Sequence, residues 1–233
     1  MAYALEAQAG VLDVSVVIPA LNAAGHLAQT LAAYEGVREI IVVDGGSSDD
    51  TRRVAQSAGA RFVAAQRGRG PQLHKGATEA RGGWLLFVHA DTVLSGEWRR
   101  DIQVFMATPA NRLRAATFRF GLDEASARAR RLERRVAWRV RRFGLAYGDQ
   151  GLLMHRDLYH ALGGFRPWPL MEDVDLVRRI GRRGLTVLPS VARTSAQRWR
   201  RDGWRRRSAR NLGCLALYFL GVPPRVIARL YGR

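Results

Sequence analysis

The sequence is poor in cysteine and in long apolar runs, and each shortage excludes a class of protein. Its single cysteine, Cys214, excludes an intrachain disulfide and favours a reducing, cytoplasmic compartment. The longest apolar run, residues 212–222, has about half the roughly 20 residues that a membrane-spanning helix needs. No basic region followed by an apolar stretch opens the chain. We therefore expect neither a membrane span nor a signal peptide.

Acidic residues are few beside the basic ones. The chain has 38 Lys and Arg against 20 Asp and Glu, a formal net charge of +18, and Lys75 is its only lysine. A coding bias toward Arg and Ala is one interpretation. The other is a polyanionic neighbour, which can be a nucleoside diphosphate, an anionic lipid or a nucleic acid. With 233 residues and 47% hydrophobic content, the chain fits one domain with at most a small appendage.

Two glycine-rich signatures are also missing. No Gly-x-Gly-x-x-Gly opens a helix after the first apolar strand, and the chain has no Gly-x-x-x-x-Gly-Lys-Ser/Thr. These absences argue against a dinucleotide-dependent oxidoreductase and against a P-loop NTPase.

The first hundred residues alternate strand and helix signals. Short runs rich in Val and Ile, with no polar alternation, predict strands at residues 14–18, 39–43, 61–64 and 84–88. Helical spacing and capping residues lie between them, at residues 26–34, 47–58 and 71–80. Repeated β-α-β units of this kind predict an α/β fold, with an open, mostly parallel sheet that helices cover.

The second half is more mixed. It predicts strands at residues 113–120, 152–155 and 186–188, and helices at residues 124–143 and 173–182. It contains neither a repeat nor a clear linker. We expect one domain over residues 1–190 and an extension rich in Arg and Trp, residues 191–233, that is helical and packs on the same domain.

Acidic residues follow two of the predicted strands. Asp44 and Asp91 each lie just past a strand end, and in open α/β sheets ligands bind beyond the carboxyl ends of the strands. An aspartate there can bind a ribose, a base or a divalent cation. A turn at Asp44 and a helix cap at Asp91 are the structural alternatives. Gly45 and Gly46 allow a ligand to approach the backbone.

A third acidic group, Glu172 and Asp173, precedes a predicted helix. Acids at a helix start interact favourably with the helix dipole, which is a purely structural role. Two neighbouring carboxylates also raise one another's pKa, which suits one of them to act as a general base near neutral pH. Chemistry alone leaves both interpretations open.

Taken together, these segments resemble the family 2 glycosyltransferases of the GT-A fold. The similarity covers residues 14–185 and is carried by Val-Ser-Val-Val-Ile-Pro-Ala-Leu-Asn (14–22), Glu-Ile-Ile-Val-Val-Asp-Gly-Gly-Ser-Ser-Asp-Asp-Thr (39–51), Gly-Arg-Gly (68–70), Lys-Gly-Ala (75–77), Leu-Phe-Val-His-Ala-Asp-Thr (86–92), Gly-Asp-Gln-Gly (148–151) and Met-Glu-Asp-Val-Asp-Leu (171–176). The sequence is most similar to the small, single-domain bacterial branch of the radical SAM/selenodomain-associated type.

The resemblance implies a role for each matching residue. It implies a nucleotide-sugar site at Pro19, Ala20, Asn22, Asp44, Gly45, Arg69, Lys75, His89, Ala90 and Asp91. Asp91 would hold Mg²⁺ or Mn²⁺ on the diphosphate. Asp173, next to Glu172, would be the catalytic base of an inverting transfer. The sugar and the acceptor would be bordered by Gly148, Asp149 and Gln150.

Three positions depart from the family pattern. His89 replaces the first aspartate of the Asp-x-Asp motif, which leaves the metal preference open because imidazole suits borderline metals better than Mg²⁺. His89 can equally be a donor behind the metal ligands. Ala23 and Ala24 replace glutamates, and His74 replaces an asparagine.

The resemblance implies a metal-assisted glycosyltransferase that uses a nucleotide-sugar, with UDP as the favoured nucleotide. It leaves the acceptor unassigned, and a lipid-linked acceptor is one candidate. Arginines and tryptophans between residues 198 and 207 precede the apolar run. They predict either an interfacial helix on an anionic membrane surface or a terminal helix with a solvated Arg face. Trp199, in Gln-Arg-Trp (197–199), is a candidate acceptor-side residue.

Three other functions compete. A nucleotidyltransferase shares a related fold and metal use, but it usually carries a Gly-rich basic signature where this chain has Pro-Ala-Leu-Asn (19–22). A nucleic-acid binder is suggested by the basic stretch at residues 128–142, which no recognition motif accompanies. A nucleotide-sugar binder without catalysis is the third, and His89 is its only support.

Overall fold

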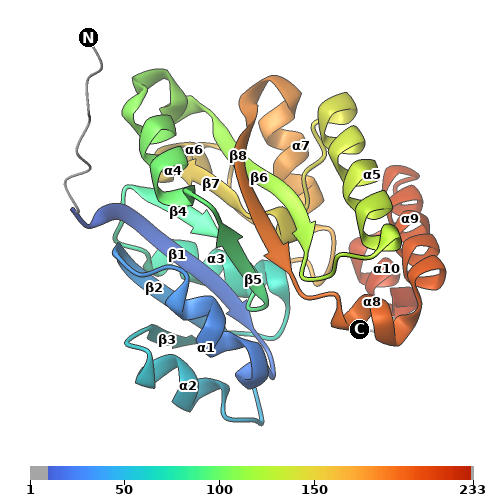
Figure 1. Ribbon diagram of the computed structural model, residues 1–233, viewed down its shortest axis with the longest axis horizontal. Helices are drawn as coiled ribbons and strands as arrows, with labels where there is room; N and C mark the ends of the chain where they lie inside the picture. The colour runs from blue at the N-terminus through green and yellow to red at the C-terminus, as the bar shows by residue number, and fades with distance from the viewer. Residues whose placement is uncertain (1–9, 232–233) are drawn as a thin grey trace.

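The computed structural model describes residues 10–231, and within them one eight-stranded sheet runs through the molecule in the order β3-β2-β1-β4-β7-β6-β8-β5 (Figure 1). The strands are β1 (Leu12–Ala20), β2 (Val37–Asp44), β3 (Arg61–Ala64), β4 (Trp84–Phe87), β5 (Thr92–Ser95), β6 (Ala115–Leu122), β7 (Leu152–His155) and β8 (Leu185–Thr194).

The two halves of the sheet differ in strand direction. In the first half β1 pairs in parallel with β2 and β4, and β2 pairs in parallel with β3. In the second half β7 is antiparallel to both β4 and β6, β8 is parallel to β6, and β5 is antiparallel to β8. The predicted α/β fold with a mostly parallel sheet is confirmed.

Helices cover both faces of this sheet (Figure 1). They are α1 (Ala24–Ala32), α2 (Thr51–Ser57), α3 (Arg69–Glu79), α4 (Trp98–Ala107), α5 (Ala127–Phe143), α6 (Arg156–Ala161), α7 (Glu172–Gly184), α8 (Gln197–Asp202), α9 (Trp204–Phe219) and α10 (Pro224–Tyr231), with short 3₁₀ turns η1 (Pro109–Leu113) and η2 (Gly148–Gln150). Apolar residues of α1, α2 and α4 pack on one face, and those of α3, α6 and α7 on the other. Of the β1 side chains, Val14, Val16 and Ile18 lie in the first cluster and Val17 in the second, so this strand is buried on both faces.

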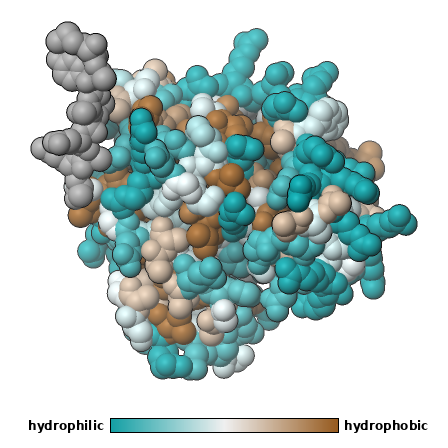
Figure 2. All heavy atoms as spheres, viewed as in Figure 1, coloured by the Kyte–Doolittle hydropathy of each residue, from teal (hydrophilic) through white to brown (hydrophobic). Residues whose placement is uncertain are grey.

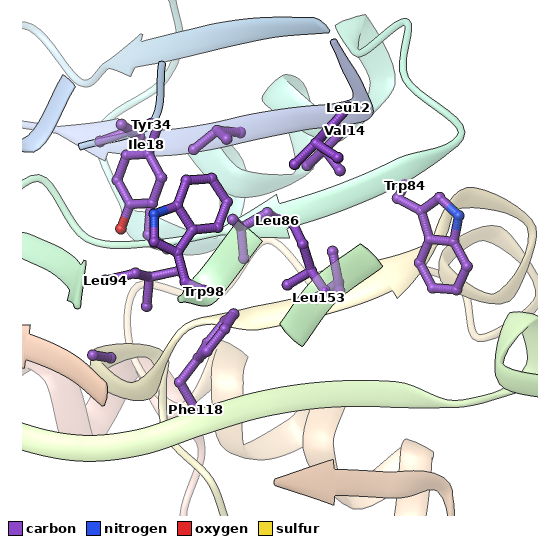
Figure 3. Packing of buried hydrophobic residues seen from close by; sticks show 14 of the residues in the cluster. Leu12, Val14, Ile18, Tyr34, Trp84, Leu86, Leu94, Trp98, Phe118 and Leu153 are labelled. Carbon is purple, nitrogen blue, oxygen red and sulfur yellow. The ribbon is translucent and has the colours of Figure 1, made fainter. Parts of the chain in front are cut away.

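Aromatic side chains fill the first of these clusters. The Tyr34 and Trp98 rings meet edge to face with centroids 5.6 Å apart, close to Leu94 (Figure 3). The Tyr34 hydroxyl donates to the Thr92 carbonyl at 3.0 Å, so the buried phenol keeps a hydrogen bond. This packing ties the start of β5 to the helices, and Asp91 immediately precedes that strand.

Three elements were not predicted, namely β5, α4 and α6, and β8 is longer than the predicted strand at residues 186–188. β8 also runs through residue 190, where we placed the domain boundary, and the first helix after it begins at Gln197. None of the helices within residues 10–231 is long and apolar enough to cross a membrane.

The C-terminal helices pack on the rest of the chain through two apolar clusters. Trp199 and Trp204 join α5 residues Val136 and Val140 in one cluster. In the other, Cys214, Ile227 and Ala228 lie against Leu170, Met171 and Val174 at the start of α7. The C-terminal helices therefore contact the α7 terminus that carries Asp173.

Candidate active site

The ends of β1 and β2 bring the predicted nucleoside residues together. Ala20 pairs with Asp44 in the sheet register, and the Gly45 amide donates to the Ala20 carbonyl at 3.0 Å. Gln72 of α3, which the sequence did not single out, donates from its amide nitrogen to the carbonyls of Ala20 and Val43, each at 2.7 Å. A Cβ on Gly45 would lie 3.2 Å from the Gln72 amide, so this amide would have to shift by a few tenths of an ångström to make room for a side chain.

The Asp44 carboxylate closes a turn. One oxygen accepts from the Gly46 amide at 2.9 Å and the Ser47 amide at 2.8 Å, and the other accepts from the Ser47 hydroxyl. The structural alternative for Asp44 is therefore realised. A carboxylate has about four acceptor positions, so Asp44 keeps capacity for a hydroxyl or a base N–H.

Asn22 holds the same turn from the side of β1. Its backbone has a φ of 51°, and its side-chain oxygen accepts from the Ser48 amide at 2.9 Å. The Asn22 amide in turn donates to the Ser47 hydroxyl at 2.8 Å. Asparagine tolerates this left-handed conformation better than most residues, which accounts for its place after Pro-Ala-Leu.

A cavity of about 150 Å³, which none of the turn residues lines, collects the other candidate groups. The loop after β4 contributes His89 and Asp91, and α3 contributes Arg69. Its remaining walls come from η2, the start of α7 and the C-terminal helices, and consist of Tyr147, Asp149, Leu170, Met171, Asp173, Val174, Thr194, Ser195, Arg198, Trp199, Arg207, Asn211, Cys214, Leu215 and Tyr231. Asp91, Asp149 and Asp173, which the sequence singled out in three separate segments, thus line one cavity.

Asp91 retains most of its capacity to bind a cation. Arg198 of α8 lies 3.3 Å from one carboxylate oxygen, and the Thr194 hydroxyl lies 3.4 Å from the other. Within residues 10–231 no group of three or more His, Cys, Asp or Glu side chains converges on a metal position. One carboxylate with loose partners fits a cation such as Mg²⁺ or Mn²⁺ that takes its other ligands from phosphate and water.

His89 faces a guanidinium. Its Nε2 lies 3.4 Å from Arg69, and because a guanidinium only donates, the imidazole nitrogen is the acceptor. Burial, together with the Arg69 charge, lowers the pKa of His89 to about 4. His89 is therefore neutral at neutral pH, with the Nε2 lone pair directed at Arg69. At Nε2 His89 is thus an acceptor from Arg69, whereas the sequence suggested a donor behind the metal ligands.

Arg69 is held in turn by Glu172. Its Nε lies 2.8 Å from a carboxylate oxygen of Glu172, whose side chain is only 1% exposed. In the first turn of α3, carbonyl oxygens of Arg166 and Trp168 lie within 2.6 Å of where a Cβ on Gly70 would lie. Any larger residue there would force α3 and this loop apart.

Asp173 lies in the first turn of α7 and is oriented by two amides. One carboxylate oxygen accepts from the Gly148 amide at 2.8 Å and the other from the Val174 amide at 2.8 Å. A Cβ on Gly148 would lie 2.7 Å from His89 Nε2 and 3.3 Å from the Asp173 carboxylate. The glycine thus allows His89 and Asp173 to approach the same backbone segment.

Asp149 and Tyr147 present polar atoms with no partner. Among the described residues, Asp149 Oδ1 and the Tyr147 hydroxyl are buried and make no hydrogen bond. Burial raises the pKa of Asp149 to about 6, against the opposing charge of Arg139. The Arg139 guanidinium also stacks on the Tyr147 ring, 3.5 Å from its centroid. Unpaired buried polar atoms on a cavity wall indicate a ligand that supplies their hydrogen bonds.

Other predicted site residues lie elsewhere or have other contacts. Lys75 is exposed, pairs with Glu79 at 2.9 Å and does not line this cavity. The Gln150 amide is buried and donates to the Phe118 carbonyl at 3.0 Å. The Ala90 carbonyl accepts from Thr30, and Trp199 lines the cavity while stacking on Trp204 with centroids 5.6 Å apart.

Comparison with known proteins decides the family. The model of the family described as glycosyl transferase family 2 matches residues 15–163. The chain belongs to this family. It is a glycosyltransferase with a GT-A fold, as the sequence predicted.

Solved structures with the same fold share little sequence with this glycosyltransferase. Glucosyl-3-phosphoglycerate synthase from Mycobacterium tuberculosis, in complex with Mn²⁺, UDP-glucose and phosphoglyceric acid, is 20% identical with a TM-score of 0.57, over 78% of this chain and 70% of that one. S. aureus TarS, residues 1–349, is 15% identical with a TM-score of 0.58, over 78% of this chain and 60% of that one.

Proposed function

We propose that this glycosyltransferase moves a sugar from a UDP-sugar to an acceptor hydroxyl in one inverting displacement, with Asp173 as the base. One observation carries the proposal: Asp91 and Asp173 line the same cavity. The synthase from M. tuberculosis, solved with UDP-glucose and Mn²⁺, supports UDP as the nucleotide and Mn²⁺ as the cation. We also assign the chain to the single-domain branch of the radical SAM/selenodomain-associated type.

The donor would lie with its nucleoside at Pro19, Asn22 and Asp44 and its diphosphate toward Asp91. A divalent cation held by Asp91 would stabilise the negative charge of the leaving diphosphate as a Lewis acid. The guanidinium groups of Arg69 and Arg198 add fixed positive charge at the same place. Glu172 forms an ion pair with Arg69. We therefore assign it the positioning of the Arg69 guanidinium and not the role of a base.

In the reaction, the acceptor hydroxyl gives its proton to Asp173 while its oxygen bonds to the anomeric carbon. The bond from that carbon to the diphosphate oxygen breaks, and the diphosphate leaves with the electron pair. The amides of Gly148 and Val174 fix the Asp173 carboxylate, which limits the reorganisation that proton transfer requires. Asp149 Oδ1 and the Tyr147 hydroxyl are the proposed partners of the sugar or acceptor hydroxyls.

The acceptor would enter along the wall that the C-terminal helices form with the start of α7. Five of the residues on that wall are apolar or weakly polar, namely Leu170, Met171, Val174, Cys214 and Leu215. Such a wall suits an acceptor whose hydroxyl is attached to an apolar body, which includes the predicted lipid-linked class.

Replacing Asp173 with Asn tests the assignment of the base. Asp173→Asn keeps the size but cannot take a proton, and its single amide oxygen can accept from only one of the Gly148 and Val174 amides, so sugar transfer should fall by about 10²–10⁴-fold. UDP binding, measured by calorimetry with Mn²⁺, should be unchanged. Asp13→Asn, an exposed acid paired with Arg38, is the control and should keep full activity. Full transfer by Asp173→Asn would show that another group is the base.

A further inference from the structure

A second, strongly basic hollow lies outside the active site, between α5 and α9. This groove has a volume of about 740 Å³ and is lined by Arg128, Arg131, Leu132, Arg135, Gly203, Trp204, Arg205, Arg206 and Ser208. We name it the α5–α9 groove. Five of its nine lining residues are arginines, and none is acidic.

The groove arginines differ from those of the active site in their partners. Arg69 and Arg198 are each within 4 Å of a carboxylate, Glu172 and Asp91. No ion pair within the part of the chain that the structure describes involves any of the five groove arginines, all of which are exposed. Five guanidinium groups crowded without a counter-charge repel one another, so the arrangement favours a bound polyanion.

One face of the α5 helix continues the groove as a stripe of arginines with one tryptophan. Residues 128, 131, 135, 138 and 142 follow one another by three or four positions, so they lie on one face of the helix. Four of them are arginines, and the fifth is Trp138, which is 57% exposed. Trp138 also shares a surface hollow of about 290 Å³ with Arg131, Arg134 and Arg135.

Exposed apolar side chains are concentrated in the same part of the molecule. Within residues 10–231, twelve large hydrophobic residues are exposed, and seven of them belong to α5, α9, α10 or the α9–α10 connection. They are Trp138, Phe143, Leu212, Phe219, Leu220, Val226 and Leu230. These helices gather at one end of the sheet (Figure 1), and hydrophilic side chains dominate that edge of the space-filling view (Figure 2).

We propose that this surface binds an anionic phospholipid bilayer, with lipid phosphates in the α5–α9 groove and the exposed apolar residues at the acyl boundary. Arginines beside tryptophan and leucine are the composition of interfacial helices. A nucleic acid would also satisfy the arginines, but it offers no partner for the exposed leucines and phenylalanines of α9 and α10. The bilayer therefore accounts for both kinds of side chain.

The α9 helix connects this surface with the active site. Arg205 and Arg206 line the groove, whereas Arg207, Asn211, Cys214 and Leu215 line the active-site cavity. A bilayer bound at the groove would thus lie one helix away from the cavity wall where we place the acceptor. The proposal does not depend on the catalytic assignment, because none of the groove residues belongs to the cavity.

Vesicle sedimentation of the full chain tests the proposal. The protein should bind vesicles containing phosphatidylglycerol but not pure phosphatidylcholine vesicles, and high salt should weaken binding. Since each arginine near an anionic surface contributes about a fivefold change, the triple variant R131Q/R135Q/R206Q should bind about 100-fold more weakly. The control R52Q/R67Q/R112Q removes three exposed arginines from α2, the β3–α3 loop and η1, and should lose much less.

Two further variants separate the contributions. Trp138→Ala should weaken vesicle binding without changing the net charge, and Asp91→Asn should bind vesicles like the wild type because the active site is not used. Failure to bind anionic vesicles at low salt would overturn the proposal. So would equal losses in the groove and control triples, or binding of a 20-nucleotide DNA in preference to vesicles.

Discussion

At the scale of single residues, the active site combines acids that differ in their surroundings. Asp173 is held by two backbone amides, Asp91 has only long contacts to Arg198 and Thr194, and Asp149 has an oxygen with no partner among the described residues. Such differences fit the three roles that we propose for this cavity, namely a base, a cation ligand and a hydroxyl-binding group. The arrangement depends on close packing at Gly148, which lies between His89 and Asp173.

The neutral state of His89 predicts how stability depends on pH. Its pKa is lowered from 6.5 to about 4 in the folded chain, so between these values the unfolded chain binds more protons. The free energy of unfolding should be undiminished by His89 above pH 6.5 and should fall by up to about 3 kcal/mol as the pH drops toward 4. Denaturation of His89→Gln should lack this part of the loss. An imidazole NMR titration with a midpoint near 6.5 would contradict the assignment.

The close packing around Gly148 predicts that adding one methyl group there lowers sugar transfer. In Gly148→Ala the new Cβ would lie 2.7 Å from His89 Nε2, so either His89 or Asp173 must move. A displacement of about 1 Å at the base should lower transfer by about 10²-fold. Gly25→Ala on α1, where a Cβ meets nothing within 4 Å, is the matched control for turnover assays. Full activity of Gly148→Ala would show that this contact is not required.

At the scale of elements, the parallel half of the fold was readable because its strands are buried on both faces. The β1 run of Val and Ile supplies both core clusters, so its pattern and its burial agree. β5 was missed because its four residues, Thr92–Ser95, follow the loop of Asp91 directly and resemble a continuation of it. The short α6 likewise has only six residues, too few to show a helical period.

The sequence marked residues of the candidate site only where a motif contains them. Asp44, Asp91 and Asp173 follow strand ends or open a helix, and those places are visible in sequence. Gln72, Arg139 and Arg198 come from elements whose packing determines what they reach, and no local signal marks them. Lys75 shows the converse: it lies within a matching motif but on the outer side of α3, paired with Glu79.

A substitution in the C-terminal helices should affect acceptor binding without affecting donor binding. Leu215 of α9 lines the cavity, whereas Leu212, three residues earlier, is 68% exposed and does not. Leu215→Trp should fill the acceptor wall and raise the acceptor KM by at least about tenfold, since a buried contact of this size is worth 1–3 kcal/mol. UDP binding should be unchanged, as should transfer by the control Leu212→Trp. Loss of UDP binding in Leu215→Trp would place the donor, not the acceptor, at this wall.

At the scale of the whole molecule, the chain has a net charge of +18, and its arginines occur in two kinds of surroundings. Around the cavity the cations are matched by acids, as in the pairs Arg69–Glu172 and Arg198–Asp91, which leaves a site able to hold a diphosphate and its cation. In the α5–α9 groove the arginines have no acidic neighbours on its lining. Composition alone suggested a polyanionic partner, and the structure separates the small-ligand site from the surface that would bind an extended one.

The most direct test of the central claim is to identify what the wild-type chain releases from sugar nucleotides. UDP-, GDP- and dTDP-sugars should be supplied with Mn²⁺ or Mg²⁺, and the products read by mass spectrometry, with Asp91→Asn in parallel. The account predicts that a nucleoside diphosphate forms from a UDP-sugar and that Asp91→Asn lowers its rate at least about 10²-fold. Release of a sugar 1-phosphate, which a nucleotidyltransferase leaves when it cleaves between the two phosphates, or binding of the donors without any turnover would contradict it.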